Sequence, residues 1–212
     1  APMLKHILAT AIALMTTAAM AAPTDAPNRS ATVKMAFPDG HGSGFYIGTH
    51  LGVDMYVTAG HVIGDVLATP VKIELSSGET AVMNTILLYD AFDDLAIIES
   101  DDNLRPQIPD EINCTPPKQG DVVSTEGYPV DLPVVRTYGR VASDGVTHWG
   151  PWPEILVMNM TVAPGNSGGP VFDVDGKVIG IVVGWLPGTG FSAVIPMKRI
   201  CDWLSSRPKE AA

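Results

Sequence analysis

Short apolar segments constrain the fold of this chain more than any other feature. From residue 31 to residue 195 they alternate with turn-forming residues, and the 212-residue chain holds 21 glycines and 18 prolines. No amphipathic run of helical length lies between the segments of the first half. Short apolar runs bounded by glycine and proline turns are typical of antiparallel strands. We therefore expect an all-β protein.

The apolar segments form two sets. The first comprises Thr32–Phe37, Phe45–Thr49, Met55–Thr58, Val71–Leu75, Ala81–Leu88 and Leu95–Ile98. The second comprises Val122–Thr125, Val134–Ser143, Ile155–Thr161, Pro170–Phe172, Val178–Gly184 and Phe191–Ile195. Residues 38–44 are rich in glycine and predict a hairpin or loop. Residues 101–120 hold four prolines and predict a crossing between two units, and the apolar spacing of residues 197–206 predicts a C-terminal helix.

The N-terminal segment predicts export. Lys5 and His6 precede an uncharged run, Ile7–Met20, and a small-x-small site follows at Ala19-Met20-Ala21. We expect residues 3–21 to be a signal peptide, residues 22–30 a linker, and the mature protein to be secreted or periplasmic. An uncleaved anchor is the weaker interpretation, because a spanning helix needs about 20 apolar residues.

A glycine-flanked serine is the main candidate for chemistry. Ser167 lies in the stretch Gly165-Asn166-Ser167-Gly168-Gly169-Pro170, just before an apolar strand. A nucleophilic serine needs an exposed oxygen on a tight turn and backbone N–H groups directed at the developing oxyanion. Glycines allow such a turn, and we expect the N–H groups of Gly165 and Ser167 to form the oxyanion hole.

A serine nucleophile also needs a base and a carboxylate that orients the base. Among the five histidines, only His61 lies at the end of an apolar strand, in Thr58-Ala59-Gly60-His61-Val62. Asp94 opens the apolar strand Leu95–Ile98, whereas the adjacent Asp93 should point to the opposite face. His41, His50 and His148 lack the spacing of a metal site, so we expect neither a metal nor a cofactor.

These motifs resemble those of the trypsin/chymotrypsin-like serine proteases, and most closely the compact bacterial Deg/HtrA type. The matching pieces are Gly42-Ser43-Gly44-Phe45, Thr58-Ala59-Gly60-His61-Val62, Asp94-Leu95-Ala96-Ile97-Ile98 and the Ser167 stretch, in the family order of His, Asp and Ser. The resemblance implies two antiparallel six-stranded β-barrels with a C-terminal helix, within a protease domain of residues 31–206. Barrel one would cover about 31–100, the crossing 101–120, barrel two about 121–196, and the helix 197–206.

The resemblance also implies an activity, the hydrolysis of peptide bonds through an acyl-enzyme. Ser167 would attack the carbonyl carbon, His61 would carry the proton, and Asp94 would hold the imidazole. Asn166 replaces the acid that precedes the serine in trypsins, so we expect no activation by zymogen cleavage and a local hydrogen bond from Asn166 to the turn. We expect no peptide-binding PDZ domain after Ala212, although Deg/HtrA-type enzymes often carry one.

Two further features follow from the same resemblance. Several trypsins join a similar crossing to a similar helix, which favours a Cys114–Cys201 disulfide over two free buried thiols. The substrate pocket would be lined by Thr161, Val183, Gly184, Trp185 and Ser192. Because no aspartate stands at its base, we expect cleavage after small or medium apolar residues. Trp149 and Trp152 fit either an extended substrate groove or an ordinary packing corner.

A net charge of −10 argues against nucleic acid or an anionic membrane surface as a partner. We expect a protein or peptide substrate, no stable membrane association once the signal is removed, and leave the oligomeric state open. Two alternatives remain: a non-catalytic binding homologue on the same fold, and a membrane-tethered protease that processes a longer polyprotein.

Overall fold

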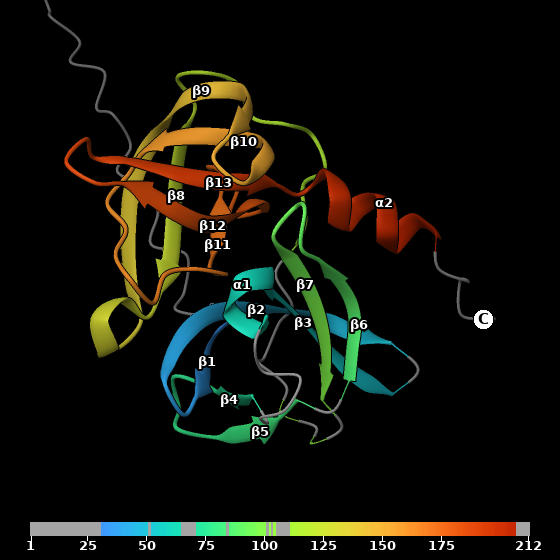
Figure 1. Ribbon diagram of the computed structural model, residues 1–212. Coiled ribbons are helices and arrows are strands. Elements are labelled where there is room, and N and C mark those ends of the chain that lie inside the picture. The colour runs from blue at the N-terminus through green and yellow to red at the C-terminus, as the bar shows by residue number, and fades with distance from the viewer. Residues whose placement is uncertain are drawn as a thin grey trace, which may run out of the picture.

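The computed structural model describes residues 31–50, 52–64, 71–83, 85–100, 102, 104 and 111–206. The expected signal peptide and linker, residues 3–30, lie outside this part of the chain. Two β units stand against each other, with a short helix between them and a longer helix at the C-terminal end (Figure 1). No helix within the described ranges is both long and apolar enough to cross a membrane.

The first unit is a seven-stranded antiparallel sheet in the order β5-β4-β1-β2-β3-β7-β6. Its strands are β1 (Thr32–Phe37), β2 (Gly40–His50), β3 (Val53–Ala59), β4 (Lys72–Glu74), β5 (Thr80–Val82), β6 (Thr85–Asp90) and β7 (Leu95–Ser100). Helix α1 (Gly60–Ile63) follows β3 directly. The inner strands β3 and β7 are buried along nearly their whole length, which agrees with the uninterrupted apolar runs Met55–Val57 and Leu95–Ile98.

The second unit is a closed six-stranded barrel in the order β10-β13-β12-β11-β8-β9. Its strands are β8 (Val122–Gly127), β9 (Val135–Trp149), β10 (Trp152–Asn159), β11 (Pro170–Phe172), β12 (Val178–Leu186) and β13 (Phe191–Pro196). A short 3-10 helix, η2 (Pro129–Asp131), connects β8 to β9, and helix α2 (Lys198–Ser206) follows β13. All six strands lie within or beside segments that the sequence predicts.

The expected all-β, chymotrypsin-like fold with a C-terminal helix is confirmed, with two corrections in the first unit. The described strands of this unit form a seven-stranded sheet rather than a closed six-stranded barrel, and the segment Ala81–Leu88 contributes to two of them, β5 and β6. The glycine-rich stretch 38–44 includes the turn of the expected hairpin, but β2 already starts at Gly40 and pairs with β1 from there. A Cβ atom on Gly42 would lie 2.7 Å from the Val62 side chain. Glycine here permits the close approach of a neighbouring element, which is one of its uses inside strands.

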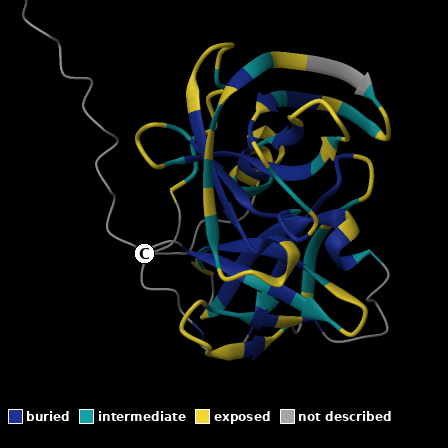
Figure 2. Ribbon diagram, turned by 90° about the vertical axis from the view of Figure 1, so that its left-hand side faces the viewer, coloured by how far each residue is buried: buried dark blue, intermediate teal, exposed yellow. Residues whose placement is uncertain are grey.

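The two units share their hydrophobic core, and the buried residues concentrate in the middle of the molecule (Figure 2). One cluster joins Tyr56 and Val62 of the first unit to Ile155 and Val183 of the second. Another joins Phe45 and Leu95 to Phe172, Ile181 and Met197. Residues at the junction are therefore positioned by packing from both sides.

Helix α2 packs on the first unit and is also linked to the crossing segment. The sulfur atoms of Cys114 and Cys201 lie at bonding distance, with their Cα atoms 6.0 Å apart. Arg199 on the same helix forms an ion pair with Asp93, next to the turn that precedes β7. The C-terminal helix thereby contacts the turn that carries Asp94.

Candidate active site

His61 lies in helix α1, at the end of the buried strand β3. Gly60 precedes it, and a Cβ atom on Gly60 would lie 3.0 Å from the amide nitrogen of Leu95. The absence of that atom lets the start of the helix reach the turn before β7. The His61 side chain is 47% exposed, so its ring stands at the surface of the junction.

Asp94 is the last residue of that turn, and two groups of His61 donate hydrogen bonds to its carboxylate. The His61 backbone N–H donates to Oδ1 at 2.7 Å, and the ring Nδ1 lies 2.8 Å from Oδ2. The indole Nε1–H of Trp152 also donates to Oδ2, at 3.0 Å. Burial raises the pKa of the Asp94 carboxyl, but the bonds from His61 and Trp152 outweigh it and hold the pKa below its ordinary value.

The backbone of Asp94 is held in an uncommon conformation, with φ at 52°. Aspartate tolerates this left-handed region better than most residues. The neighbouring Asp93 faces away from the site and pairs with Arg199 of α2. The reversal of chain direction at Asp94 thus sends one carboxylate to the imidazole and the other to the C-terminal helix.

Ser167 occupies a tight turn built by its glycine neighbours. Gly165 and Gly168 have φ values of 99° and 86°, which are accessible to glycine at little cost. Within the turn, Asn166 N–H donates to Ala163 O at 3.0 Å. The turn also docks on β12, because Gly168 N–H donates to Val182 O at 2.8 Å.

Ser43 of the first unit fastens this turn across the junction between the units. Its N–H donates to Ser167 O at 2.7 Å, and its Oγ donates to Gly165 O at 2.7 Å. The same Oγ accepts a hydrogen bond from Tyr128 N–H at 3.0 Å. Ser43 is fully buried. In the sequence, Ser43 is identified only as part of the motif Gly42-Ser43-Gly44-Phe45. Its hydrogen bonds to the Ser167 turn could not be predicted, because their partners lie about 85 and 122 positions away.

The backbone N–H groups of Gly165 and Ser167 have no hydrogen-bond acceptor among the described residues. The peptide before Gly165 is oriented by Val130, whose N–H donates to Pro164 O at 2.8 Å. Because C=O and N–H point in opposite directions across a trans peptide, this bond turns the Gly165 N–H away from Val130. Two unengaged amides beside a serine are the arrangement expected of an oxyanion hole.

The turn that supplies Val130 N–H has an unusual backbone. Val130 and Asp131 have φ values of 45° and 62°, a region that costs about 1–3 kcal/mol for residues other than glycine. The side chain of Asp131 accepts a hydrogen bond from Lys34 at 3.0 Å and lies 3.3 Å from Nδ1 of His41. Residues of β1 and β2 therefore hold the turn in place.

The Ser167 turn lies beside the start of helix α1, because a Cβ atom on Gly168 would be 2.9 Å from Ala59 N, but no hydrogen bond joins the side chains of Ser167 and His61 in the described part of the chain. The proximity of the turn and the helix follows from Gly42, which lies between them: a Cβ atom there would be 2.7 Å from Val62 and 3.1 Å from Ser167 O. The structure thus brings the imidazole–carboxylate pair and the serine turn to one place. Catalytic hydrogen bonds are often long or poorly aligned without substrate.

The expected pocket residues do not all present side chains to one space. Trp185 and Ser192 pair on adjacent strands β12 and β13, with Trp185 43% exposed and the Ser192 side chain buried. Ser192 Oγ has no hydrogen-bond partner among the described atoms. Val183 is buried in the core shared by the two units. Thr161 lies beyond the end of β10, exposed, with its carbonyl bonded to Thr137 Oγ1.

Gly184 is expected from the sequence to line the substrate pocket, and Asn166 to form a local side-chain hydrogen bond in the turn. A Cβ atom on Gly184 would lie 3.1 Å from the Trp152 ring, so the space beside Gly184 belongs to the indole. Asn166 is buried, yet its Oδ1 accepts no hydrogen bond within the described ranges. The expected local bond from the Asn166 side chain is therefore not formed by this oxygen, and backbone hydrogen bonds and Ser43 hold the turn instead.

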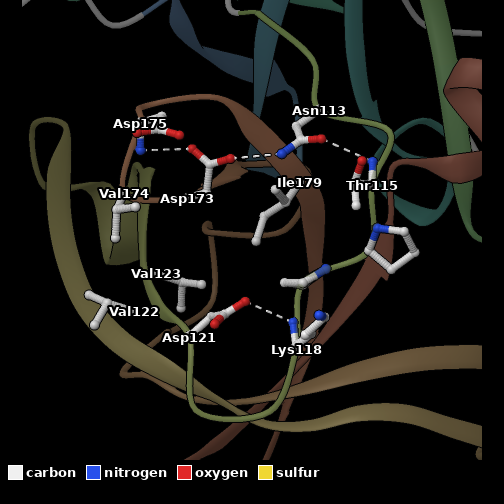
Figure 3. Close-up of a pocket in the computed structure, with 12 residues that line it drawn as sticks. Asn113, Thr115, Lys118, Asp121, Val122, Val123, Asp173, Val174, Asp175 and Ile179 are labelled. Atoms are coloured by element: carbon white, nitrogen blue, oxygen red, sulfur yellow. Dashed lines mark hydrogen bonds between the residues drawn. The ribbon is translucent and has the colours of Figure 1, made fainter.

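A cavity of about 390 Å³ lies elsewhere, between the crossing segment and the turn that joins β11 to β12 (Figure 3). Its polar groups already bond to one another: Asn113 Nδ2 donates to Asp173 at 3.0 Å, and Lys118 N–H donates to Asp121 at 2.8 Å. None of the three candidate catalytic residues lines this cavity. The junction between the units remains the candidate active site.

The fold and this site together define a class of protein. Two β units with an imidazole–carboxylate pair on one and a glycine-flanked serine on the other are the architecture of the chymotrypsin-like proteases. The model of the trypsin-like peptidase domain family matches residues 42–181. The chain belongs to that family.

Known proteins similar to this chain support a bacterial, Deg/HtrA-like type. The anti-sigma-I factor RsgI9 of Acetivibrio thermocellus is 27% identical over 176 residues, covering 80% of this chain and 23% of the relative. A probable periplasmic DegP-like serine endoprotease of Bartonella henselae is 32% identical over 146 residues, covering 68% of this chain and 28% of the relative. The chain thus spans about a quarter of the length of these relatives.

A solved structure of an HtrA-type protease with a tripeptide has the same fold. It superposes with a TM-score of 0.72 at 21% sequence identity, covering 84% of this chain and 60% of the other. At this identity the likeness bears on the fold alone. It agrees with the two β units seen here.

Proposed function

We propose that this chain is a serine endopeptidase that hydrolyses peptide bonds through an acyl-enzyme on Ser167. The observation that carries the proposal is the junction itself, where the His61–Asp94 pair lies beside a serine turn with two unengaged amides. Membership of the trypsin-like peptidase domain family supports the same reaction. The substrate would be a protein or peptide.

The hydrogen bond to Asp94 determines which ring nitrogen of His61 carries the proton. An ionised carboxylate only accepts hydrogen bonds, so Nδ1 must carry the proton that it shares with Asp94 Oδ2. In the neutral imidazole this leaves Nε2 without a proton, ready to take one from the Ser167 hydroxyl. The lowered pKa of Asp94 keeps this carboxylate ionised at neutral pH, so that it also stabilises the imidazolium that forms.

The reaction then follows from the positions of these groups. Ser167 Oγ attacks the carbonyl carbon of the scissile bond while His61 takes its proton. The negative charge on the carbonyl oxygen is stabilised by the N–H groups of Gly165 and Ser167. His61 gives the proton to the leaving amine, and a water molecule, activated by the same imidazole, hydrolyses the acyl-enzyme. Removing Ser167 or His61 should lower kcat by about 10⁴–10⁶.

Labelling with a fluorophosphonate probe tests this proposal directly, since the probe reacts only with an activated serine. We expect the wild-type protein to be labelled, with mass spectrometry locating the adduct on Ser167. Ser167→Ala should abolish labelling and His61→Ala should slow it strongly. Absence of labelling in folded wild-type protein would refute the catalytic role.

A non-catalytic binding homologue is the second candidate. One observation favours it: Ser167 and His61 share no side-chain hydrogen bond within the described part of the chain. One relative is also named as an anti-sigma factor rather than as a protease. A binding homologue would resist the probe yet retain affinity for peptides, which peptide-array binding to Ser167→Ala would reveal.

The specificity and location of the enzyme are further parts of the proposal. We propose cleavage after small or medium apolar residues, because none of the expected pocket residues carries a charge. A cut-site profile from a peptide library, with Ser167→Ala as control, tests this preference. Export to the periplasm or medium is supported by the DegP-like relative. A mature N-terminus near Ala22 would support export, and one that retains residues 3–21 would favour a tethered protease.

A further inference from the structure

Trp152 makes a contact that neither the motifs nor the reaction requires. Its indole Nε1–H donates a hydrogen bond of 3.0 Å to Oδ2 of Asp94, the same oxygen that receives the His61 ring N–H. Asp94 belongs to the first unit and Trp152 to the second, 58 positions later. The imidazole and the indole are thus two donors, one from each unit, on one carboxylate oxygen.

The surroundings of Trp152 hold its ring in this orientation. Trp152 opens β10 and pairs with Trp149 at the end of β9, and the two rings stack with centroids 5.3 Å apart and an interplanar angle of 15°. Both rings pack against the shared core that contains Val62, next to His61. On another side, Gly184 of β12 leaves room for the indole, since a Cβ atom there would lie 3.1 Å from the ring.

The chemistry of the indole limits what it can do at this oxygen. An indole N–H is a donor only, so it cannot take a proton from His61 or compete as a base. It favours the ionised carboxylate, and it occupies one lone-pair direction of Oδ2, which leaves the other to the imidazole. The neighbouring carboxylates Asp90 and Asp93 face Arg199 of α2 instead. Among the described residues, the hydrogen bonds to the Asp94 side chain come from His61 and Trp152 alone.

We propose that Trp152 is a positioning residue for catalysis, which orients the Asp94 carboxylate so that His61 remains in the reactive tautomer. This role rests on the proposed function, because it matters only if the His61–Asp94 pair serves a nucleophile. It differs from both sequence interpretations of the Trp149–Trp152 pair, a substrate groove and a plain packing corner. A packing role requires the ring, whereas a positioning role requires the N–H group.

Trp152→Phe tests the proposal, because it keeps an aromatic ring and removes the N–H donor together with part of the ring area. Trp203→Phe makes the same chemical change on α2 and serves as the matched control. We expect Trp152→Phe to lower kcat about 10- to 100-fold, the range for a lost hydrogen bond to a charged group, with KM nearly unchanged. The acid limb of the pH profile of kcat/KM, which reports protonation of the general base His61, should move to higher pH, because an Asp94 carboxylate with one donor fewer attracts the imidazolium more strongly.

A second measurement is independent of turnover. In ¹H–¹⁵N spectra, the indole N–H signal of Trp152 should shift as Asp94 is protonated below about pH 4, and Asp94→Asn should remove that transition. The indole signals of Trp185 and Trp203 should not follow it. Wild-type protein that fails to react with fluorophosphonate would refute the proposed function, yet these spectra would still test the contact.

Two results would overturn the positioning role. One is a Trp152 indole signal that does not respond to the ionisation of Asp94. The other is a Trp152→Phe variant whose kcat and acid limb match those of Trp203→Phe. A variant that is merely less stable would lower the active fraction without moving the acid limb, so titration of active sites separates the two causes.

Discussion

Gly165→Ala is the substitution that tests the serine turn most sharply. At a φ of 99°, alanine costs about 1–2 kcal/mol more than glycine. The added Cβ atom would lie 2.5 Å from His41 Nε2 and also too close to the Tyr128 carbonyl oxygen. Overpacking of this kind costs about 1–3 kcal/mol. The native turn would therefore be destabilised by about 2–5 kcal/mol.

This cost is comparable to or larger than the contribution of the hydrogen bonds on the Gly165 peptide groups. The two hydrogen bonds on the Gly165 peptide groups, from Val130 N–H to Pro164 O and from Ser43 Oγ to Gly165 O, contribute about 1–3 kcal/mol together. We therefore expect the turn to shift and the Gly165 N–H to leave the oxyanion hole. Loss of one oxyanion donor lowers kcat by about 10²–10³.

The assay is kcat on a fluorogenic peptide, with urea unfolding of the same samples at 25 °C. Gly176→Ala is the matched control, since Gly176 also has a positive φ, 77°, but no atom lies within 4 Å of a Cβ placed there. It should lose about 1–2 kcal/mol of stability and keep its activity. The reasoning is refuted if Gly165→Ala turns over substrate as fast as Gly176→Ala does.

Three further outcomes can be measured. Asp94→Asn keeps the side-chain shape and tolerates the positive φ, yet kcat should fall by about 10⁴, because the amide cannot hold His61 in the same tautomer. The folded pKa of Asp94 lies below the unfolded value, so its stabilising effect is present above that unfolded value and is lost as pH falls through the folded pKa. Urea unfolding should thus show a stability loss below about pH 4 that is smaller in Asp94→Asn. Replacing both Cys114 and Cys201 by serine should lower the free energy of unfolding by up to about 4–5 kcal/mol for a separation of 87 residues, and reductant should then have no further effect.

The strands and the three candidate catalytic residues could be predicted because their signals are local. The alternation of apolar segments with turn-forming residues, together with short motifs, identifies each strand within a few positions. His61, Asp94 and Ser167 each stand at the end or start of an apolar run. Glycine obscured the start of one strand. The predicted hairpin is present, but Gly42 and Gly44 already lie in its second strand, β2, where they admit the side chains of Val62 and Met35.

The supporting residues could not be predicted, because their roles arise from contacts across the junction. Ser43 bonds to Gly165 across 122 positions, and Trp152 bonds to Asp94 across 58. Val130 has neither a reactive group nor a motif, and it contributes only a backbone N–H from a strained turn. Such roles depend on the register and docking of the two units, which local patterns do not encode.

The fastening of the Ser167 turn by Ser43 has a consequence for how this molecule matures. The second unit alone contains the serine but lacks Ser43, which donates two hydrogen bonds to the turn and accepts one from Tyr128 N–H. Under the proposed function, a chain whose two units have not docked lacks these hydrogen bonds, and its Ser167 turn is not held in position for catalysis.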